Sequence, residues 1–277
     1  MVTTFRSTIL AISLLLSSSL VTAGVIYTQP VTSLNDDSIT HLINSVILNP
    51  GDRLQGVFEI SSTNGGAIAP TELTGIYDIT VLSKVSDGGT GFDYTFGPSS
   101  GGLFSSGTMI RFYEDVSNDL DLTGSTNCSS PTDCLSKAGF GGTGYLSLGF
   151  SGDTDEFWAA NLVDLTTAEI LALPSTTVVG SFSNALSILE NNTGVSFGSL
   201  DCPLCTGDGE IDWLASGTFL GGGSLTNGFF ARGDMTGFLA PIPEPGSMSL
   251  LLAALLGLFA VGFCRTQESI TGKNSAV

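Results

Sequence analysis

The sequence predicts an all-β fold, a glycine-rich antiparallel β-sandwich or barrel with one or two short helices. Apolar and polar residues alternate with a period of two over many short segments, as in half-buried strands. Glycine-rich turns separate these segments, and the chain has 36 glycines in 277 residues. It shows no internal repeat of fixed period, which disfavours a solenoid. These observations favour a sandwich or a barrel and do not distinguish between the two.

The first residues are typical of a secretory signal peptide. Arg6 supplies a positive charge, residues 9–16 form an apolar stretch, and residues 21–23 are small. We therefore predict cleavage after Ala23 and exclude residues 1–23 from the folded domain.

Residues 24–240 form the predicted domain, and its strands follow from the alternation. The clearest patterns are Tyr77–Val81, Phe92–Phe96 and Leu146–Phe150, in which apolar residues alternate with polar or small ones. The further predicted strands are Leu54–Ile60, Met109–Tyr113, Thr177–Phe182, Val195–Leu200, Trp213–Leu220 and Gly228–Leu239.

Two segments have helical character. Thr166 is a possible N-cap with Glu169 three residues later, and Pro174 follows the expected end of that helix. Residues 36–48 fit either a helix or a pair of strands, because their apolar residues satisfy both periods.

The charges of the predicted domain exclude several functions. Residues 24–240 contain five basic and 24 acidic residues, a net charge of −19, against −18 for the whole chain. Nucleic-acid binding requires clustered Lys and Arg, so we exclude it. His41 is the only histidine, which excludes multi-histidine catalysis and histidine-rich metal sites. The sequence Gly97–Gly101 matches G-x-S-x-G, but no helix is expected after it and no histidine follows it. We assign no catalytic residue and predict a non-enzymatic protein.

Four cysteines lie in this domain, as two closely spaced couples. Cys128 and Cys134 enclose a polar loop, and Cys202 and Cys205 form a C-x-x-C. In an exported protein these spacings favour two disulfides, each closing a short loop. Pairing between the two couples and a zinc site built from four sulfurs remain as alternatives.

Clusters of acidic residues are the remaining candidates for chemistry. Asp208, Glu210 and Asp212 alternate along the chain and are weak candidates for Ca²⁺ ligands, although they lack the twelve-residue calcium loop pattern. Two further clusters are 153–156 and 115–121. Solvated turn residues that keep the protein soluble are the simpler interpretation. A pair of such carboxylates also suits a glycosidase, whose mechanism needs no histidine. We expect no cofactor apart from this weak calcium candidate.

The C-terminal segment combines a proline-rich lead with an apolar stretch. Residues 241–245 read Pro-Ile-Pro-Glu-Pro, and residues 247–264 are 18 uncharged, mostly apolar residues. As a helix this stretch spans ~27 Å, which is near the short limit for crossing the hydrocarbon core of a membrane. Arg265 closes it, and a polar cytoplasmic tail is expected at 266–277.

This tail, Pro243-Glu244-Pro245 followed by an apolar helix and Arg265, resembles the PEP-CTERM sorting signal. The resemblance covers residues 241–265 and implies a Gram-negative bacterial protein that a membrane-embedded exosortase recognises. It further implies delivery to the cell surface or to the exopolysaccharide matrix of a biofilm, with exopolysaccharide as a possible partner. The family usually carries a cluster of basic residues after the helix, and here only Arg265 is adjacent. An ordinary single-pass anchor after a proline-rich stalk is the alternative.

The predicted function is therefore that of an exported, non-enzymatic protein of the cell surface or exopolysaccharide matrix. The alternative is a secreted carbohydrate-active protein, a lectin or a glycosidase, that uses the Asp and Glu clusters. Two carboxylates facing each other across a groove would favour the glycosidase.

Overall fold

The computed structural model describes residues 31–43, 45–64, 66–67, 72–115, 117, 119–122, 126–223 and 225–242. In this part of the chain, no helix is both long and apolar enough to cross a membrane. Several predicted features lie outside the described residues, namely the cleavage site at Ala23, the sorting residues Pro243, Glu244, Pro245 and Arg265, and the membrane helix 247–264.

The fold is mostly β. The strands are β1 (Thr32–Ile43), β2 (Arg53–Thr63), β3 (Gly66–Ala67), β4 (Glu72–Ser86), β5 (Gly91–Pro98), β6 (Thr108–Asp115), β7 (Leu146–Gly149), β8 (Phe157–Val163), β9 (Val178–Asn191), β10 (Phe197–Gly198), β11 (Leu200–Asp201), β12 (Glu210–Ile211), β13 (Trp213–Gly221) and β14 (Ala231–Pro241). The helices are α2 (Pro131–Lys137) and α3 (Thr167–Ala172).

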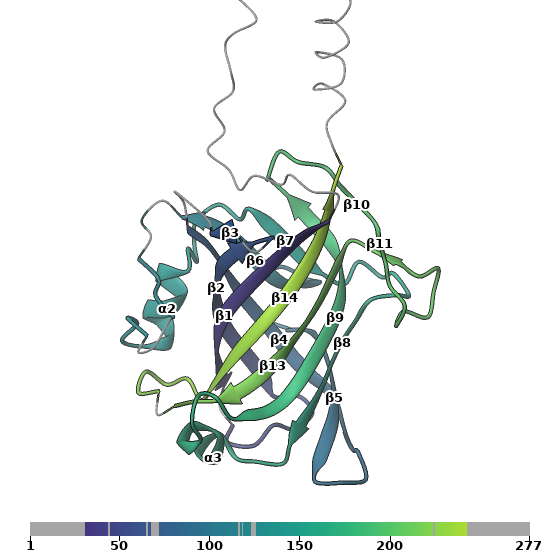
Figure 1. The fold of residues 1–277 in the computed structure, drawn as a ribbon. Coiled ribbons are helices and arrows are strands. Elements are labelled where there is room, and N and C mark those ends of the chain that lie inside the picture. Colours follow the sequence, from purple (N-terminus) through teal and green to yellow (C-terminus); the bar gives the residue numbers. More distant parts are fainter. Residues whose placement is uncertain are drawn as a thin grey trace, which may run out of the picture.

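The main sheet closes on itself as an eight-stranded antiparallel barrel (Figure 1). The ring runs β1–β14–β13–β9–β7–β6–β4–β2 and returns to β1. Closure joins segments that are far apart in the sequence, since β1 pairs with β14 along its length. A closed ring leaves none of its strands with an unpaired edge, which removes the main route to edge-to-edge aggregation.

Two long strands allow the barrel wall to continue past β6 and β7. Residues 72–77 of β4 pair with β6, whereas residues 79–86 pair with β5. In the same way, residues 187–191 of β9 pair with β7 and residues 180–185 pair with β8. Because β5 and β8 also pair with each other, they bridge β4 and β9 in the other half of the barrel.

Large aromatic side chains fill the barrel. Trp213, Phe58 and Phe112 are almost fully buried, and their rings pack edge to face, with Phe112 5.1 Å from Phe58 and 5.6 Å from Trp213 between centroids. Glycines make room for such rings, because Gly75 lies directly opposite Phe58 on the neighbouring strand, and a Cβ at that position would overlap the ring. The sequence interpretation, in which glycine marks turns, misses this role of strand glycines.

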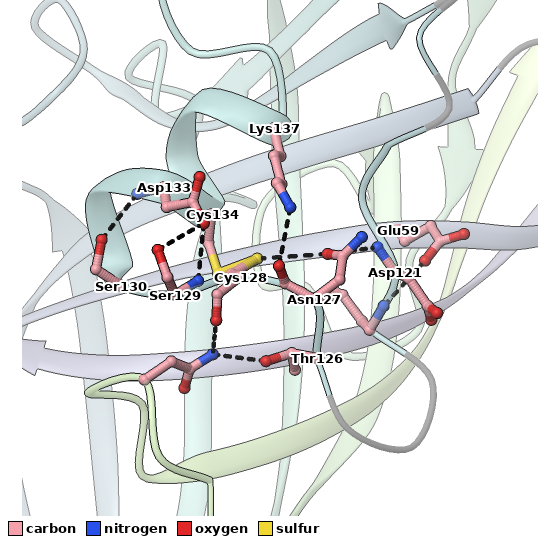
Figure 2. The surroundings of a disulfide bond; sticks show 12 residues. Glu59, Asp121, Thr126, Asn127, Cys128, Ser129, Ser130, Asp133, Cys134 and Lys137 are labelled. Carbon is pink, nitrogen blue, oxygen red and sulfur yellow. Dashed lines mark hydrogen bonds between the residues drawn. A yellow bond between two sulfur atoms is a disulfide. The ribbon is translucent and has the colours of Figure 1, made fainter.

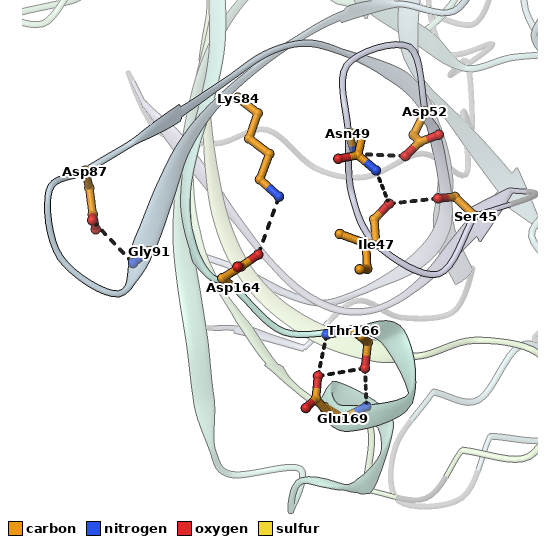
Figure 3. A network of polar contacts seen from close by, with 10 residues as sticks. All are labelled: Ser45, Ile47, Asn49, Asp52, Lys84, Asp87, Gly91, Asp164, Thr166 and Glu169. Atoms are coloured by element: carbon orange, nitrogen blue, oxygen red, sulfur yellow. Dashed lines mark hydrogen bonds and ion pairs between the residues drawn. The ribbon is translucent and has the colours of Figure 1, made fainter.

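Helix α3 covers one end of the barrel. Its capping box is as predicted, since Thr166 Oγ1 accepts from the backbone N–H of Glu169 at 3.2 Å and the Glu169 carboxylate accepts from the N–H of Thr166 at 2.8 Å (Figure 3). Beside the helix, Lys84 Nζ lies 3.4 Å from an oxygen of Asp164, which holds the β8–α3 connection against β4.

A long connection between β6 and β7 crosses the outside of the barrel and contains α2 (Figure 1). We call its described residues, 119–122 and 126–145, the strap. The strap and the β13–β14 connection bury a second apolar cluster against β1, β2, β4 and β6, whose members are Ile39, Val57, Ile76, Tyr113, Leu120, Leu122, Cys128, Cys134, Ala138, Leu225 and Phe229. These strands are therefore apolar on both faces over part of their length.

Most strand predictions agree with the structure, but of the predicted strand Val195–Leu200 only residues 197–198 (β10) and 200 (in β11) lie in strands. Residues 36–43 belong to β1, so the helical interpretation of 36–48 is wrong for them; their neighbours are β2 and β14. Helix α2 and strand β8 were not predicted, because α2 is only seven residues long and β8 carries Ala159 and Ala160 in place of large β-formers. The barrel, rather than the sandwich, is the fold observed.

Candidate functional site

The inside of the barrel has little free space. A cavity of about 40 Å³ lies beneath α3, among side chains such as Leu42, Tyr94 and Phe219. A second cavity, of about 20 Å³, lies deeper, beside Asp36 and Trp158. Sites for organic ligands usually have several hundred Å³, so neither cavity is large enough for one.

Asp36 is a carboxyl group inside this barrel. Its Oδ1 accepts from the backbone N–H of Met235 at 2.6 Å. Burial raises the pKa of Asp36 well above its ordinary value, and the charges of Asp234 and Asp37 add to the effect. Trp158 Nε1 lines the same cavity and has no partner among the described residues. A neutral Asp36 and one or two water molecules suit this pocket, and the lining includes no second carboxylate for hydrolysis.

A groove of about 660 Å³ lies on the outer face of β5, β8, β9 and β13, and we call it the polar groove. Side chains of adjacent strands align across it in register: Thr95 faces Ala159, Ala159 faces Ser183, and Ser183 faces Ser216. The lining residues are Asp93, Tyr94, Thr95, Ala159, Ala160, Asn161, Ser181, Phe182, Ser183, Ser216, Gly217 and Thr218.

The chemistry of the polar groove is that of short hydroxyl and amide groups. Asn161 Nδ2 donates to Asp93 Oδ1 at 2.8 Å, which orders this part of the wall. Asp93 is the only carboxylate in the lining. Glycoside hydrolysis by the usual mechanism needs two facing carboxylates, so this groove suits binding better than hydrolysis.

A second candidate lies on the outer face beneath the strap, where carboxylates converge. Glu72, the first residue of β4, and Asp115, the last of β6, are register partners, and the strap brings Asp119 beside them. One oxygen from each of the three lies within 4.8 Å of the other two. We call these three residues the acidic cluster. In the described part of the chain it is the only group of three such ligands that meets this distance.

The electrostatics of the acidic cluster are unfavourable in the absence of a cation. Glu72 is buried, with 4% of its surface exposed. Burial, together with the charges of Glu59 and Asp115, raises the pKa of Glu72 to about 7, against the lowering effect of hydrogen bonds from the N–H groups of Leu120 and Asp119. Asp115 is half-buried and Asp119 is exposed, so the cluster opens to solvent on one side.

Asp115 and Asp119 belong to the acidic group 115–121 seen in the sequence, whereas the calcium candidates Asp208, Glu210 and Asp212 lie elsewhere. Asp208 Oδ1 accepts from the N–H of Glu210 at 3.1 Å, and Asp212 Oδ2 accepts from the N–H of Ile188 at 2.8 Å. Asp208, Glu210 and Asp212 are all described, and their oxygens do not converge as those of the acidic cluster do. Glu72 was not considered from the sequence, because it stands alone there and joins the other two acids only through strand pairing.

Both predicted disulfides are present, each within its own couple: Cys128–Cys134 and Cys202–Cys205. Figure 2 shows the first, which joins α2 to the preceding part of the strap. There Lys137 Nζ donates to the backbone oxygen of Asn127 at 2.8 Å, so the loop is also closed by a polar contact. The pairing between couples and the four-sulfur zinc site are thereby excluded.

The residues of the rejected catalytic motif do not assemble into a nucleophilic site. Ser99 Oγ accepts from Thr80 Oγ1 at 3.0 Å. His41 lies on β1 and packs against Phe229 with ring centroids 6.0 Å apart, and burial lowers its pKa. The described hydrogen bonds include none between Ser99 and His41.

Comparison with known proteins gives no relative for this chain: no family model, no curated protein and no solved structure matches it.

Proposed function

We propose that this protein is an exported, non-enzymatic component of the cell surface or exopolysaccharide matrix, sorted by an exosortase through its C-terminal Pro-Glu-Pro signal. The address rests on the signal-peptide pattern ending at Ala23 and on the tail from Pro243 to Arg265. The observation that carries the non-enzymatic part is the filled barrel, whose interior cavities are about 40 and 20 Å³. A role in which the barrel acts as a stable exported body fits this interior.

The sorting part is tested by changing the signal without changing the barrel. In a Gram-negative host that carries an exosortase, the double variant Pro243→Ala, Pro245→Ala is expected to be retained in the membrane fraction, whereas the unaltered chain reaches the surface. Pro241→Ala is the matched control, because it removes a proline of the same lead outside the Pro-Glu-Pro motif. Protease accessibility on intact cells measures delivery. Equal delivery of the double variant and the control would contradict sorting through the Pro-Glu-Pro motif and would indicate that the tail is an ordinary membrane anchor.

Binding of a saccharide chain in the polar groove is the second candidate function. The groove is open, about 660 Å³ in volume, and lined with hydroxyl and amide groups suited to hydrogen bonds with sugar hydroxyls. Replacing the exposed Ser216 with Tyr places a bulky ring in the groove and obstructs it. The control is Ser61→Tyr, at an exposed serine of β2 that does not line the groove. We expect Ser216→Tyr to weaken binding of the host exopolysaccharide at least tenfold by calorimetry. If both substitutions weakened binding equally, the polar groove would not be the binding site for the saccharide.

A further inference from the structure

We propose that the acidic cluster, Glu72, Asp115 and Asp119, is a binding site for Ca²⁺. The site lies where the start of β4, the end of β6 and the strap meet on the outer face of the barrel. It is independent of the sorting signal and of the polar groove, which occupies other strands.

The geometry brings three separate parts of the chain to one point. Strand pairing places Glu72 opposite Asp115, and the strap turns back so that the N–H groups of Asp119 and Leu120 donate to Glu72 Oε2, at 3.2 and 3.4 Å. These bonds fix the Glu72 carboxylate and place the Asp119 side chain beside it. The three oxygens within 4.8 Å of one another are close enough to share one ion, since Ca²⁺–oxygen distances of ~2.4 Å allow such separations.

An unsatisfied buried oxygen indicates that the cluster needs a ligand. Glu72 Oε1 is buried and accepts no hydrogen bond from the described residues, although Glu72 is only 4% exposed. Buried carboxylate oxygens are almost always paired with a donor or a cation. A cation in the cluster gives Oε1 the partner that the described part of the protein does not provide.

The surrounding charges favour a cation over an anion or a neutral ligand. Asp115 Oδ1 is occupied by the N–H and hydroxyl of Ser117, at 2.7 and 2.6 Å, which orients the carboxylate. The groups that act on the Glu72 charge are Glu59 and Asp115, both negative. The described interactions of the cluster include no Lys or Arg side chain.

The donor set identifies the class of ion. All three ligands are carboxylate oxygens, with neither histidine nor cysteine sulfur in the cluster, which suits a hard cation rather than zinc or copper. Asp119 is exposed, so water can complete the coordination shell. The three ligands come from two strands and a loop, so their arrangement is irregular. Ca²⁺ accepts irregular coordination geometry better than Mg²⁺ does.

Bound calcium would join the strap to the barrel. Asp119 belongs to the strap, whereas Glu72 and Asp115 belong to the wall, so one ion would hold all three together. Calcium should therefore stabilise the fold through mass action, because the ligands come together only when the chain is folded.

The experiment is a calcium titration of the full-length chain in detergent after treatment with a chelator, by calorimetry and by thermal unfolding. We expect one saturable site with Kd on the order of 10⁻⁴ to 10⁻³ M, the range of extracellular calcium modules, and a higher unfolding temperature with calcium. Asp119→Asn and Glu72→Gln should each weaken binding at least tenfold. Asp119 is exposed, so its variant avoids the risk of misfolding that attends a buried position.

Asp208→Asn is the matched control, because it removes one exposed carboxylate from an acidic loop outside the cluster. It should change Kd less than twofold. The proposal is overturned if no saturable binding occurs up to 10 mM calcium. It is also overturned if Asp208→Asn weakens binding as much as Asp119→Asn does, because calcium would then be attracted only by the overall net charge of −18 and not by a specific site. Magnesium should bind at least tenfold more weakly; tighter binding of magnesium would overturn the assignment to calcium.

Discussion

Two loops closed by disulfides lie against the barrel, and each is associated with one buried carboxylate. The strap, with Cys128–Cys134, covers Glu72, and the shorter loop of residues 201–212, with Cys202–Cys205, covers Asp155. Glu72 is 4% exposed and Asp155 is 1% exposed. Their pKa values nevertheless move in opposite directions, raised for Glu72 and lowered for Asp155.

The difference lies in the supply of hydrogen-bond donors. Burial acts to raise the pKa of Asp155, but the backbone N–H groups of Gly207 and Gly209 donate to its two oxygens and reverse the effect. Gly209 has φ = +81°, a conformation that favours glycine and helps to turn the loop back towards Asp155. Glu72 receives N–H groups on one oxygen only. Burial of a carboxylate therefore does not by itself indicate a cation site. A buried carboxylate oxygen that lacks hydrogen-bond donors does indicate one.

Removing the disulfides should produce the largest difference between the two loops. For Cys128→Ala with Cys134→Ala we expect a loss of about 3 kcal/mol in the free energy of unfolding, and for Cys202→Ala with Cys205→Ala about 2 kcal/mol. Loop-closure entropy is similar in the two cases, but the first pair packs into the larger apolar cluster beneath the strap, whereas Cys202 packs with only two other buried residues, Ala185 and Ile211. Urea unfolding measures both values. Equal losses would mean that the packing beneath the strap adds no more stability than the smaller cluster around Cys202.

Replacing each carboxylate by its amide should have opposite effects. At pH 8 with chelator, we expect Glu72→Gln to raise the free energy of unfolding by about 1 kcal/mol, because it removes a buried charge that solvent screens only in part. Asp155→Asn should lower the unfolding temperature, because a neutral amide accepts the two N–H groups of the loop less strongly.

Calcium sharpens this second comparison. With calcium at saturation the unaltered chain should become more stable than Glu72→Gln. Calcium should not reverse the other comparison, in which the unaltered chain is more stable than Asp155→Asn. Differential scanning calorimetry with and without calcium checks both statements. A destabilising Glu72→Gln under chelator would show that its hydrogen bonds to the strap outweigh its buried charge.

The strands and both disulfides could be predicted from the sequence, because alternation and short spacing are local properties. Phe92–Phe96 and Trp213–Leu220 were recognised by period, and they lie in β5 and β13. Closure into a barrel could not be predicted in this way, because it depends on pairing between β1 and β14 at opposite ends of the domain. The same limit hid Glu72, although Asp115 and Asp119 belong to the acidic group 115–121 seen in the sequence. Acids that alternate locally, such as Asp208 and Glu210, were noticed, whereas Glu72 meets Asp115 only across a strand pair.

The smallest expected effect concerns acid pH. The folded pKa of Asp155 is below its ordinary value of 3.8, so its charge contributes stability above that pH, and this contribution is lost as the pH falls through the folded pKa. Asp36 acts with the opposite sign, because its raised pKa makes stability decline as the pH rises above 3.8. A pH profile of the unaltered chain alone therefore mixes the two contributions.

The difference in stability between the unaltered chain and Asp155→Asn isolates the contribution of the Asp155 charge. Asp36 is present in both proteins and is not among the described groups that act on the pKa of Asp155, so its contribution cancels in the difference. We expect the gap in urea midpoint between the two proteins to be constant above about pH 5 and to narrow as the pH falls below 3.8 through the folded pKa of Asp155. If the gap keeps its full size as far down in pH as both proteins stay folded, Asp155 holds the loop through its shape and position rather than its charge, and the contrast with Glu72 would no longer be electrostatic.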